Sequence, residues 1–160
     1  TMGILAQTQI EHDEETSKHS ISLIISHTQI SQGIQSDGNR KWLSLPSWGI
    51  NYNYSLNKKW ALGLHTDIIV EDFAVEEPLE RAYPIATALM PSYKPGEHLA
   101  FVLGPGVEFA ETGSLFLVRA GAEYGWEIGK DWELITLITN DYRFNAFNSW
   151  AIGLGVTKRL

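Results

Sequence analysis

The chain has 160 residues, which is enough for one domain of ordinary size or one closed barrel. Its formal net charge of −7 argues against a general nucleic-acid-binding protein, which needs a basic surface. It contains no cysteine, which excludes a disulfide framework, a thiolate zinc site and a cysteine nucleophile.

The first residues have the pattern found at the end of a secretory signal. A short apolar run ends at Ala6, and a polar segment begins at Gln7. An ordinary N-terminal segment fits the same residues, so both interpretations stay open here. We expect residues 1–17 to be a signal-peptide remnant with an N-terminal segment, and residues 18–160 to form the folded domain.

From residue 18 onward, bulky apolar residues alternate with small or polar ones, which is typical of β-strands that bury one face. No stretch approaches 18 uninterrupted apolar residues, so we expect no transmembrane helix. The alternation predicts an all-β fold with eight strands, at residues 18–31, 41–55, 59–73, 82–94, 98–110, 113–128, 131–144 and 146–159.

The connections between these strands alternate in character. Three are short, polar and built around Asn, Pro or Gly, as tight hairpins require: residues 55–60, 93–98 and 127–132. The other four connections lie at the opposite end: residues 31–41, 73–82, 109–114 and 144–149. The first two of these are longer and more charged. Such alternation predicts an up-and-down meander whose two ends face different surroundings.

The charged residues of the strands fall almost entirely on one face, together with glycine and other small residues. In a soluble ligand-binding barrel the inward face is bulky and apolar, and the outward face carries long charged side chains. The narrow lumen of an eight-stranded barrel suits small residues and paired charges instead. We therefore expect the charged face inside and the apolar face toward lipid, with a soluble lipocalin-like ligand binder as an alternative.

Aromatic residues cluster near the strand ends and predict two belts around the barrel. Aromatic girdles at both interfaces, on strands longer than about 9–11 residues, are typical of membrane-spanning barrels. One belt lies beside the short turns: Tyr52, Tyr54, Trp60, Tyr93, Trp126 and Trp132. The other lies toward the longer connections: Trp42, Phe73, Tyr83, Phe109, Phe116, Tyr142, Phe144 and Trp150.

Residues 18–160 resemble the small eight-stranded β-barrel proteins of the bacterial outer membrane. The resemblance rests on the strand pattern, on the alternating turns and on the last strand, "SWAIGLGVTKRL" (149–160), in which alternate residues are apolar. That class usually ends in an aromatic residue, and Leu160 departs from it. The segment "LPSWGINYNYSLNKKWALGLHTDI" (45–68) is similar to hairpins of uncharacterised outer-membrane proteins of the Bacteroidetes type.

The resemblance implies an eight-stranded antiparallel up-and-down transmembrane β-barrel in the bacterial outer membrane. Both termini are expected in the periplasm, and the outer loops near residues 32–40, 74–81, 110–113 and 145–148. The implied partners are outer-membrane lipid and lipopolysaccharide, and the barrel-assembly machinery through the C-terminal strand. We expect a monomer with no nucleic-acid partner, no cofactor and no metal.

The charged inward positions predict a network of paired side chains, because buried charges must be paired. We expect Arg119 to pair with Glu108 or Glu123. We expect Arg143 to pair with Asp141 or with the acidic neighbours of Arg159. The predicted lumen charge network contains His65, Asp67, Glu71, Glu108, Arg119, Glu123, Asp141, Arg143 and Arg159.

Two histidines are candidates for chemistry. We expect His65 to hydrogen-bond to Asp67 or to a carboxylate on an adjacent strand. Some barrels of this class are lipid-modifying enzymes, in which a base activates a hydroxyl group. His27 with Ser31, or with a hydroxyl on a neighbouring strand, is a candidate for such an acyl hydrolase or transferase, and otherwise His27 faces the membrane interface.

The favoured function is therefore non-enzymatic: an outer-membrane barrel with a plugged, charge-networked lumen. Its role would be structural or adhesive, or it would allow limited passage of small solutes, because eight strands leave little room for a pore. The alternatives are the lipid-modifying enzyme that uses His27 and the soluble lipocalin-like binder.

Overall fold

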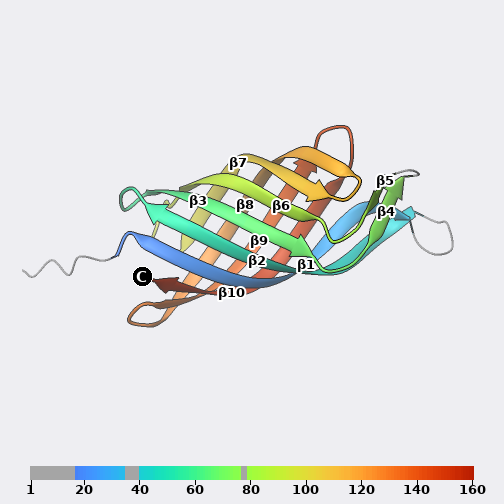
Figure 1. The fold of residues 1–160 in the computed structure, drawn as a ribbon. Coiled ribbons are helices and arrows are strands. Elements are labelled where there is room, and N and C mark those ends of the chain that lie inside the picture. Colours follow the sequence, from blue (N-terminus) through green and yellow to red (C-terminus); the bar gives the residue numbers. More distant parts are fainter. Residues whose placement is uncertain (1–16, 35–39, 77–78) are drawn as a thin grey trace, which may run out of the picture.

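The structure, a computed structural model, describes residues 17–34, 40–76 and 79–160. Eight strands pair antiparallel with their neighbours, and the last pairs back to the first, which closes a barrel (Figure 1). They are β1 (His19–Ile34), β2 (Arg40–Ser55), β3 (Trp60–Ile69), β6 (Ile85–Tyr93), β7 (Leu99–Ala110), β8 (Gly113–Gly129), β9 (Trp132–Arg143) and β10 (Asn148–Arg159). The predicted all-β, eight-stranded up-and-down barrel is therefore confirmed.

Parts of the sequence predictions concern residues that the structure does not describe. The expected signal-peptide remnant and most of the N-terminal segment lie in residues 1–16, outside the described residues. The same holds for residues 35–39 of the first long connection. No helix in the described ranges is long and apolar enough to cross a membrane.

The connection at residues 73–82, which we expected to be a loop, contains a small hairpin of two more strands. These are β4 (Phe73–Glu76) and β5 (Leu79–Arg81), and β4 meets β1 at one pair, Ile34 with Ala74. The hairpin stands at one end of the barrel, and the C-terminus lies at the other (Figure 1). We call these the hairpin end and the short-turn end.

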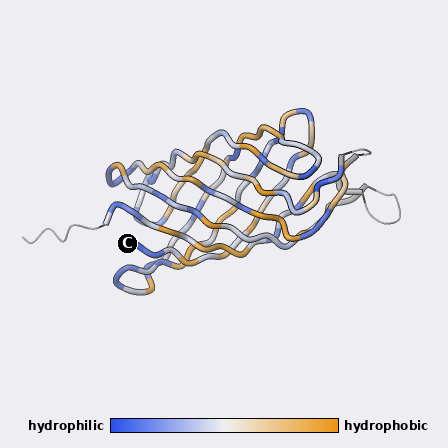
Figure 2. The backbone as a smooth tube through the Cα atoms, viewed as in Figure 1, coloured by the Kyte–Doolittle hydropathy of each residue, from blue (hydrophilic) through white to orange (hydrophobic). Residues whose placement is uncertain are grey.

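Side chains alternate between the lumen and the outer surface along every long strand. On β10, Trp150, Ile152 and Leu154 are 41%, 60% and 51% exposed, whereas Gly153 and Gly155, on the opposite face, are buried. Figure 2 shows hydrophobic and hydrophilic residues alternating along the strands. The bulky apolar face is outside and the small, polar face is inside, which contradicts the lipocalin-like alternative.

Both predicted aromatic belts are present on the outside, with one exception. Beside the short turns, Trp60 packs against Tyr93 with ring centroids 5.0 Å apart, and Tyr124 against Trp126 at 4.8 Å. At the hairpin end the exposed members are Trp42, Tyr83, Phe109, Phe116, Tyr142, Phe144 and Trp150. The exception is Phe73, which is only 7% exposed, because β3 ends at Ile69 and Phe73 belongs to the hairpin.

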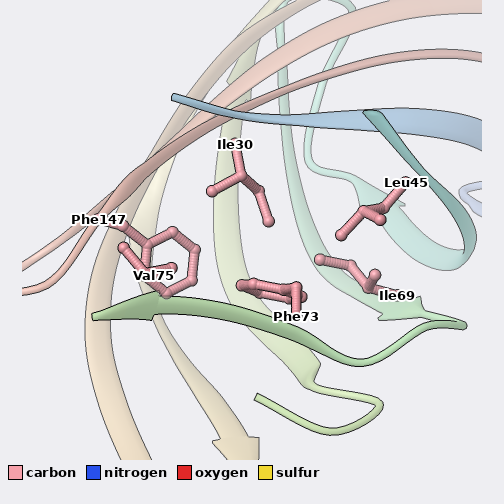
Figure 3. Packing of buried hydrophobic residues seen from close by; sticks show 6 residues of the cluster. All are labelled: Ile30, Leu45, Ile69, Phe73, Val75 and Phe147. Atoms are coloured by element: carbon pink, nitrogen blue, oxygen red, sulfur yellow. The ribbon is translucent and has the colours of Figure 1, made fainter. Parts of the chain in front are cut away.

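The hairpin end of the lumen is filled by apolar side chains. We call this group the cap cluster, and its side chains point toward one another (Figure 3). Phe73 and Phe147 meet edge to face with ring centroids 5.5 Å apart. The cluster joins β1, β2, β3 and β4 to the β9–β10 connection through Ile30, Leu45, Ile69, Phe73, Val75 and Phe147.

Strands β6 and β7 approach closely at Gly104, where a Cβ atom would overlap the backbone carbonyl oxygen of Leu89. We expect Gly104→Ala to lower the free energy of unfolding by about 1–3 kcal/mol, the usual cost of overpacking. The urea midpoint of the folded barrel in detergent measures this change. Gly96→Ala is the control, because a Cβ there would meet nothing within 4 Å. Equal midpoints for the two variants would contradict the close approach.

Candidate functional site

The lumen near the hairpin end holds three deeply buried ionic side chains. Glu108, on β7, accepts a hydrogen bond from Arg81 Nε at 2.8 Å on one oxygen and from Arg143 Nε at 2.5 Å on the other. The three residues are between 1% and 3% exposed. Two guanidinium groups therefore share one carboxylate with almost no access to water.

A second ionic group continues this one toward the middle of the barrel. Arg119, on β8, donates to both carboxylate oxygens of Asp141 at 2.6 and 2.7 Å, and it also donates to Asp67 on β3. Asp141 Oδ2 lies 3.5 Å from Arg143 Nη2, which connects the two groups. We call the whole set the lumen ion network: Arg81, Glu108, Arg143, Asp141, Arg119 and Asp67.

Neutral groups tie the network to the hairpin end. Arg81 Nη1 donates to the Gly113 carbonyl oxygen at 3.0 Å, and Arg143 Nη1 donates to Ser149 Oγ at 2.8 Å. The Arg143 guanidinium also lies 4.3 Å from the ring centroid of Phe147, a member of the cap cluster. The network and the cap cluster therefore form one continuous plug across the hairpin half of the lumen.

The pairings differ from those expected from the sequence. Arg119 pairs with Asp67 and Asp141, so the prediction of Glu108 or Glu123 is wrong. The alternation of residues along each strand places these side chains on one face of the sheet. It does not determine how far each strand is shifted along its neighbour. Arg143 does lie near Asp141, as expected, although its shorter contact is with Glu108.

Four other predicted network members lie apart from it: His65, Glu71, Glu123 and Arg159. His65 Nε2 is 2.9 Å from Asn53 Oδ1 on β2, and the nearest carboxylate to its Nδ1 is Glu123 Oε1 on β8, at 3.9 Å. The prediction that His65 hydrogen-bonds to Asp67 or to a carboxylate on an adjacent strand is therefore wrong, because its partner is the Asn53 side-chain amide. Glu71 is exposed beyond the end of β3, so it is outside the lumen.

Arg159, the last predicted member, lies at the mouth of the barrel at the short-turn end. Its Nη2 donates to Glu127 Oε1 at 2.9 Å and lies 3.9 Å from Glu133 Oε2. The mouth opens into a cavity of about 840 Å³, and a deeper cavity of about 60 Å³ shares several of its lining residues. Within the described ranges, no group of three or more His, Asp or Glu residues could hold a metal ion.

Structural comparison relates the chain to solved barrels, whereas no family model and no curated protein matches its sequence. OprG of Pseudomonas aeruginosa superposes with a TM-score of 0.56 at 11% identity, over 90% of this chain and 98% of that chain. The N-terminal β-barrel domain of OprF from the same organism gives 0.55 at 14%, over 89% and 98%. Ail, the attachment invasion locus protein of Yersinia pestis, gives 0.54 at 15%, over 88% and 98%.

The chain has the fold of the small bacterial outer-membrane β-barrels. These three matches are all β-barrels of that kind, and the expected fold is thereby confirmed. In such an outer-membrane barrel, the outward apolar band between the aromatic belts is the surface that lipid covers. The Bacteroidetes origin stays a prediction.

Arg81 is the network member that the sequence reasoning missed. It lies in a long connection of the barrel, where a charged residue is expected to face water. The available signal was the alternation of Phe73 and Val75 with Ala74, which is consistent with a strand but too short to predict one. Strand β4 pairs with β5, and β5 places Arg81 beside Glu108 in the lumen.

His27 faces outward on β1, in register with Ile152 on one side and Pro46 on the other. Ser31 Oγ donates to the Asn148 carbonyl oxygen at 3.4 Å, and the described residues show no hydrogen bond between His27 and Ser31. The base-and-hydroxyl pair that acyl transfer needs is therefore not assembled in the described geometry.

We accordingly expect His27→Ala to leave the acylation of lipid A and of phospholipids unchanged, because no hydroxyl of a described residue hydrogen-bonds to this ring. Mass spectrometry of lipids from cells that express the wild type, the variant or neither measures this. A change in acyl chains that needs the wild-type protein and is lost in the variant would revive the enzyme hypothesis.

Proposed function

We propose that the protein is a monomeric, non-conducting barrel of the outer membrane with a structural or adhesive role. The short-turn end would face the periplasm, and the hairpin end the cell exterior. The observation that carries this proposal is the burial of Glu108 between Arg81 and Arg143, directly beneath the cap cluster. A plug of this kind stiffens the barrel and leaves no continuous path along its axis.

The space left inside the plug supports the same conclusion. The cavity among the residues of the lumen ion network measures about 20 Å³. A single water molecule needs a cavity of roughly 10–15 Å³, so this one holds about one water. A hydrated ion would have to separate the paired guanidinium and carboxylate groups, which is costly in a buried site. Limited passage of small solutes is therefore the less favoured role.

We expect the wild-type protein to produce no stable channel in planar lipid bilayers. Heat-modifiable migration on a gel and recovery in the outer-membrane fraction would first establish that the inserted protein is folded. A purified porin inserted under the same conditions is the positive control for the electrical measurement. Stable, stepwise currents from the folded protein would contradict the plugged lumen.

An adhesive role would depend on the chemistry of the hairpin end. Among the residues whose side chains are described there, the exposed charged groups are carboxylates: Glu71, Asp72, Glu80 and Glu111. Ail has been solved in complex with a heparin analogue, sucrose octasulfate, which is a polyanion. The carboxylates here favour a positively charged or cation-bridged partner instead.

The remaining partners follow from the location that we propose. Lipid and lipopolysaccharide would cover the outward apolar face. The assembly machinery would bind β10, the strand that closes the barrel by pairing with β1 from Ser20–Arg159 to Ile30–Ser149. An exposed terminal strand of this kind offers backbone groups for pairing until closure is complete.

A further inference from the structure

The plug fills only the hairpin half of the lumen, so the other half is a cup that opens at the short turns. The inner part of this cup, the cavity of about 60 Å³, has walls rich in hydroxyl groups from Ser20, Ser22, Ser92 and Thr157. Its charged lining consists of three carboxylates, Glu97, Glu123 and Glu133, against one lysine, Lys94. The inner cavity is therefore polar and carries an excess of negative charge.

Glu123 has an unused acceptor in this cavity. Its Oε1 is buried and accepts no hydrogen bond from any described residue. His65 Nδ1, at 3.9 Å, is too far away to donate, and Lys94 forms no ion pair with Glu123 within the described part of the chain. A buried carboxylate oxygen that accepts no hydrogen bond is energetically unfavourable. A ligand that donates a hydrogen bond to this oxygen would therefore gain binding free energy without breaking a bond inside the protein.

The wide part of the cup carries both charges, with the positive ones in excess: Lys18, Lys58, Lys59, Lys94 and Arg159 against Glu97, Glu127 and Glu133. Lys58 and Lys59 lie in the turn between β2 and β3, and Lys18 precedes β1, and all three line the wide part of the cup. The side chains of Lys58 and Lys59 are exposed and make no ion pair with another described residue. Going inward, the cup thus changes from positive at the mouth to negative beside Glu123.

This polarity selects one class of ligand. A polyamine would be repelled by the lysines at the rim, and a polyanion by the carboxylates inside. We propose that the cup binds the free amino end of a short zwitterionic peptide, with the ammonium group at Glu123 and the carboxylate at Lys58 and Lys59. The wide part, about 840 Å³, falls within the size range of small-molecule sites, and the closed hairpin end makes the cup a binding site, not a passage.

The test uses the full chain folded in detergent micelles and three probes: tetraalanine, N-acetyl-tetraalanine and tetraalanine amide. Isothermal titration calorimetry should show saturable binding of tetraalanine, with a Kd of about 1 mM or below. Acetylation removes the ammonium group and should weaken binding by about tenfold or more, because hydrogen bonds to charged groups are strong. Amidation removes the carboxylate at the exposed rim and should have the smaller effect.

Matched variants assign these effects to residues. Glu123→Gln should reproduce the effect of acetylation on tetraalanine, and the double variant Lys58→Gln with Lys59→Gln should reproduce the effect of amidation. Glu111→Gln, at the opposite end, should bind as the wild type does. If Glu123→Gln fails to fold, the comparison of the three probes on the wild type still decides the question.

Two results would overturn the proposal: no saturable binding of tetraalanine, as expected of a cup that holds only water, or equal binding of the free and acetylated peptides. The proposal rests on the closed lumen, and the conductance of the same preparation tests that separately. Stable currents would refute the plug, whereas absent binding without currents would refute only the peptide site.

Discussion

The Glu108→Ala variant is expected to lose about 3–5 kcal/mol of its free energy of unfolding. Glu108 is the only carboxylate that contacts Arg81 among the described residues, and it makes the shorter ionic contact of Arg143. Removing it leaves Arg81, which is 1% exposed, without a carboxylate partner, and leaves Arg143, which is 3% exposed, only its longer contact with Asp141. Such an uncompensated buried charge is the costly result of breaking a buried ion pair. Urea unfolding from lipid vesicles, followed by tryptophan fluorescence and gel mobility, measures the loss.

Two further variants show whether the loss comes from charge pairing in the lumen. Glu111→Ala removes an exposed carboxylate at the hairpin end and should change stability by less than about 0.5 kcal/mol. Glu108→Gln keeps the size and one acceptor but not the charge, so it should fall between the wild type and Glu108→Ala. A loss below about 1 kcal/mol for Glu108→Ala would mean that water reaches the two arginines when Glu108 is absent.

The faces of the strands could be predicted from the sequence because they depend only on local order. A period of two assigns each residue of a strand to one side, whatever the neighbouring strands do. This is why Asp67, Arg119, Asp141 and Arg143 were correctly expected to share the lumen. It is also why the glycines among them indicated a narrow interior and not a solvent-facing surface.

The pairings inside the lumen could not be predicted, because they depend on how the strands are staggered around the closed barrel. Arg119 lies opposite Asp141 in the β8–β9 ladder, and it reaches Asp67 across the lumen from β3. Strand tilt and stagger are properties of the whole barrel and have no signature in one strand. Glu123 is equally inward on β8, yet it lies beside the cup, four residues from Arg119 toward the short turns.

The hairpin was missed for a different reason. β4 and β5 are only four and three residues long, which is too short for a period of two to stand out. Their position depends on the packing of Phe73 and Val75 against the other members of the cap cluster, and on the contact between Arg81 and Glu108. Such contacts join parts of the chain that are far apart in sequence, so the plug emerges only in three dimensions.

The second large effect is expected at Leu154, on the closing strand. This side chain points outward and is 51% exposed, midway between Trp150 and Lys158. In water, an exposed leucine tolerates replacement by arginine with little change in stability. In a bilayer, an arginine at the centre of the lipid-facing band costs about 2–4 kcal/mol. We therefore expect Leu154→Arg to lose that amount when unfolding is measured from lipid vesicles.

Leu56→Arg is the matched control, because Leu56 is 55% exposed but lies in the turn between β2 and β3, at the edge of the band. At this depth the cost of an arginine falls to about 0–1 kcal/mol. The two leucines have the same chemistry and nearly the same exposure, so only their surroundings distinguish them. Equal, small effects at both positions would mean that water, not lipid, covers the apolar face. A large effect confined to Leu154 would show that the bulky side of the last strand is built for lipid.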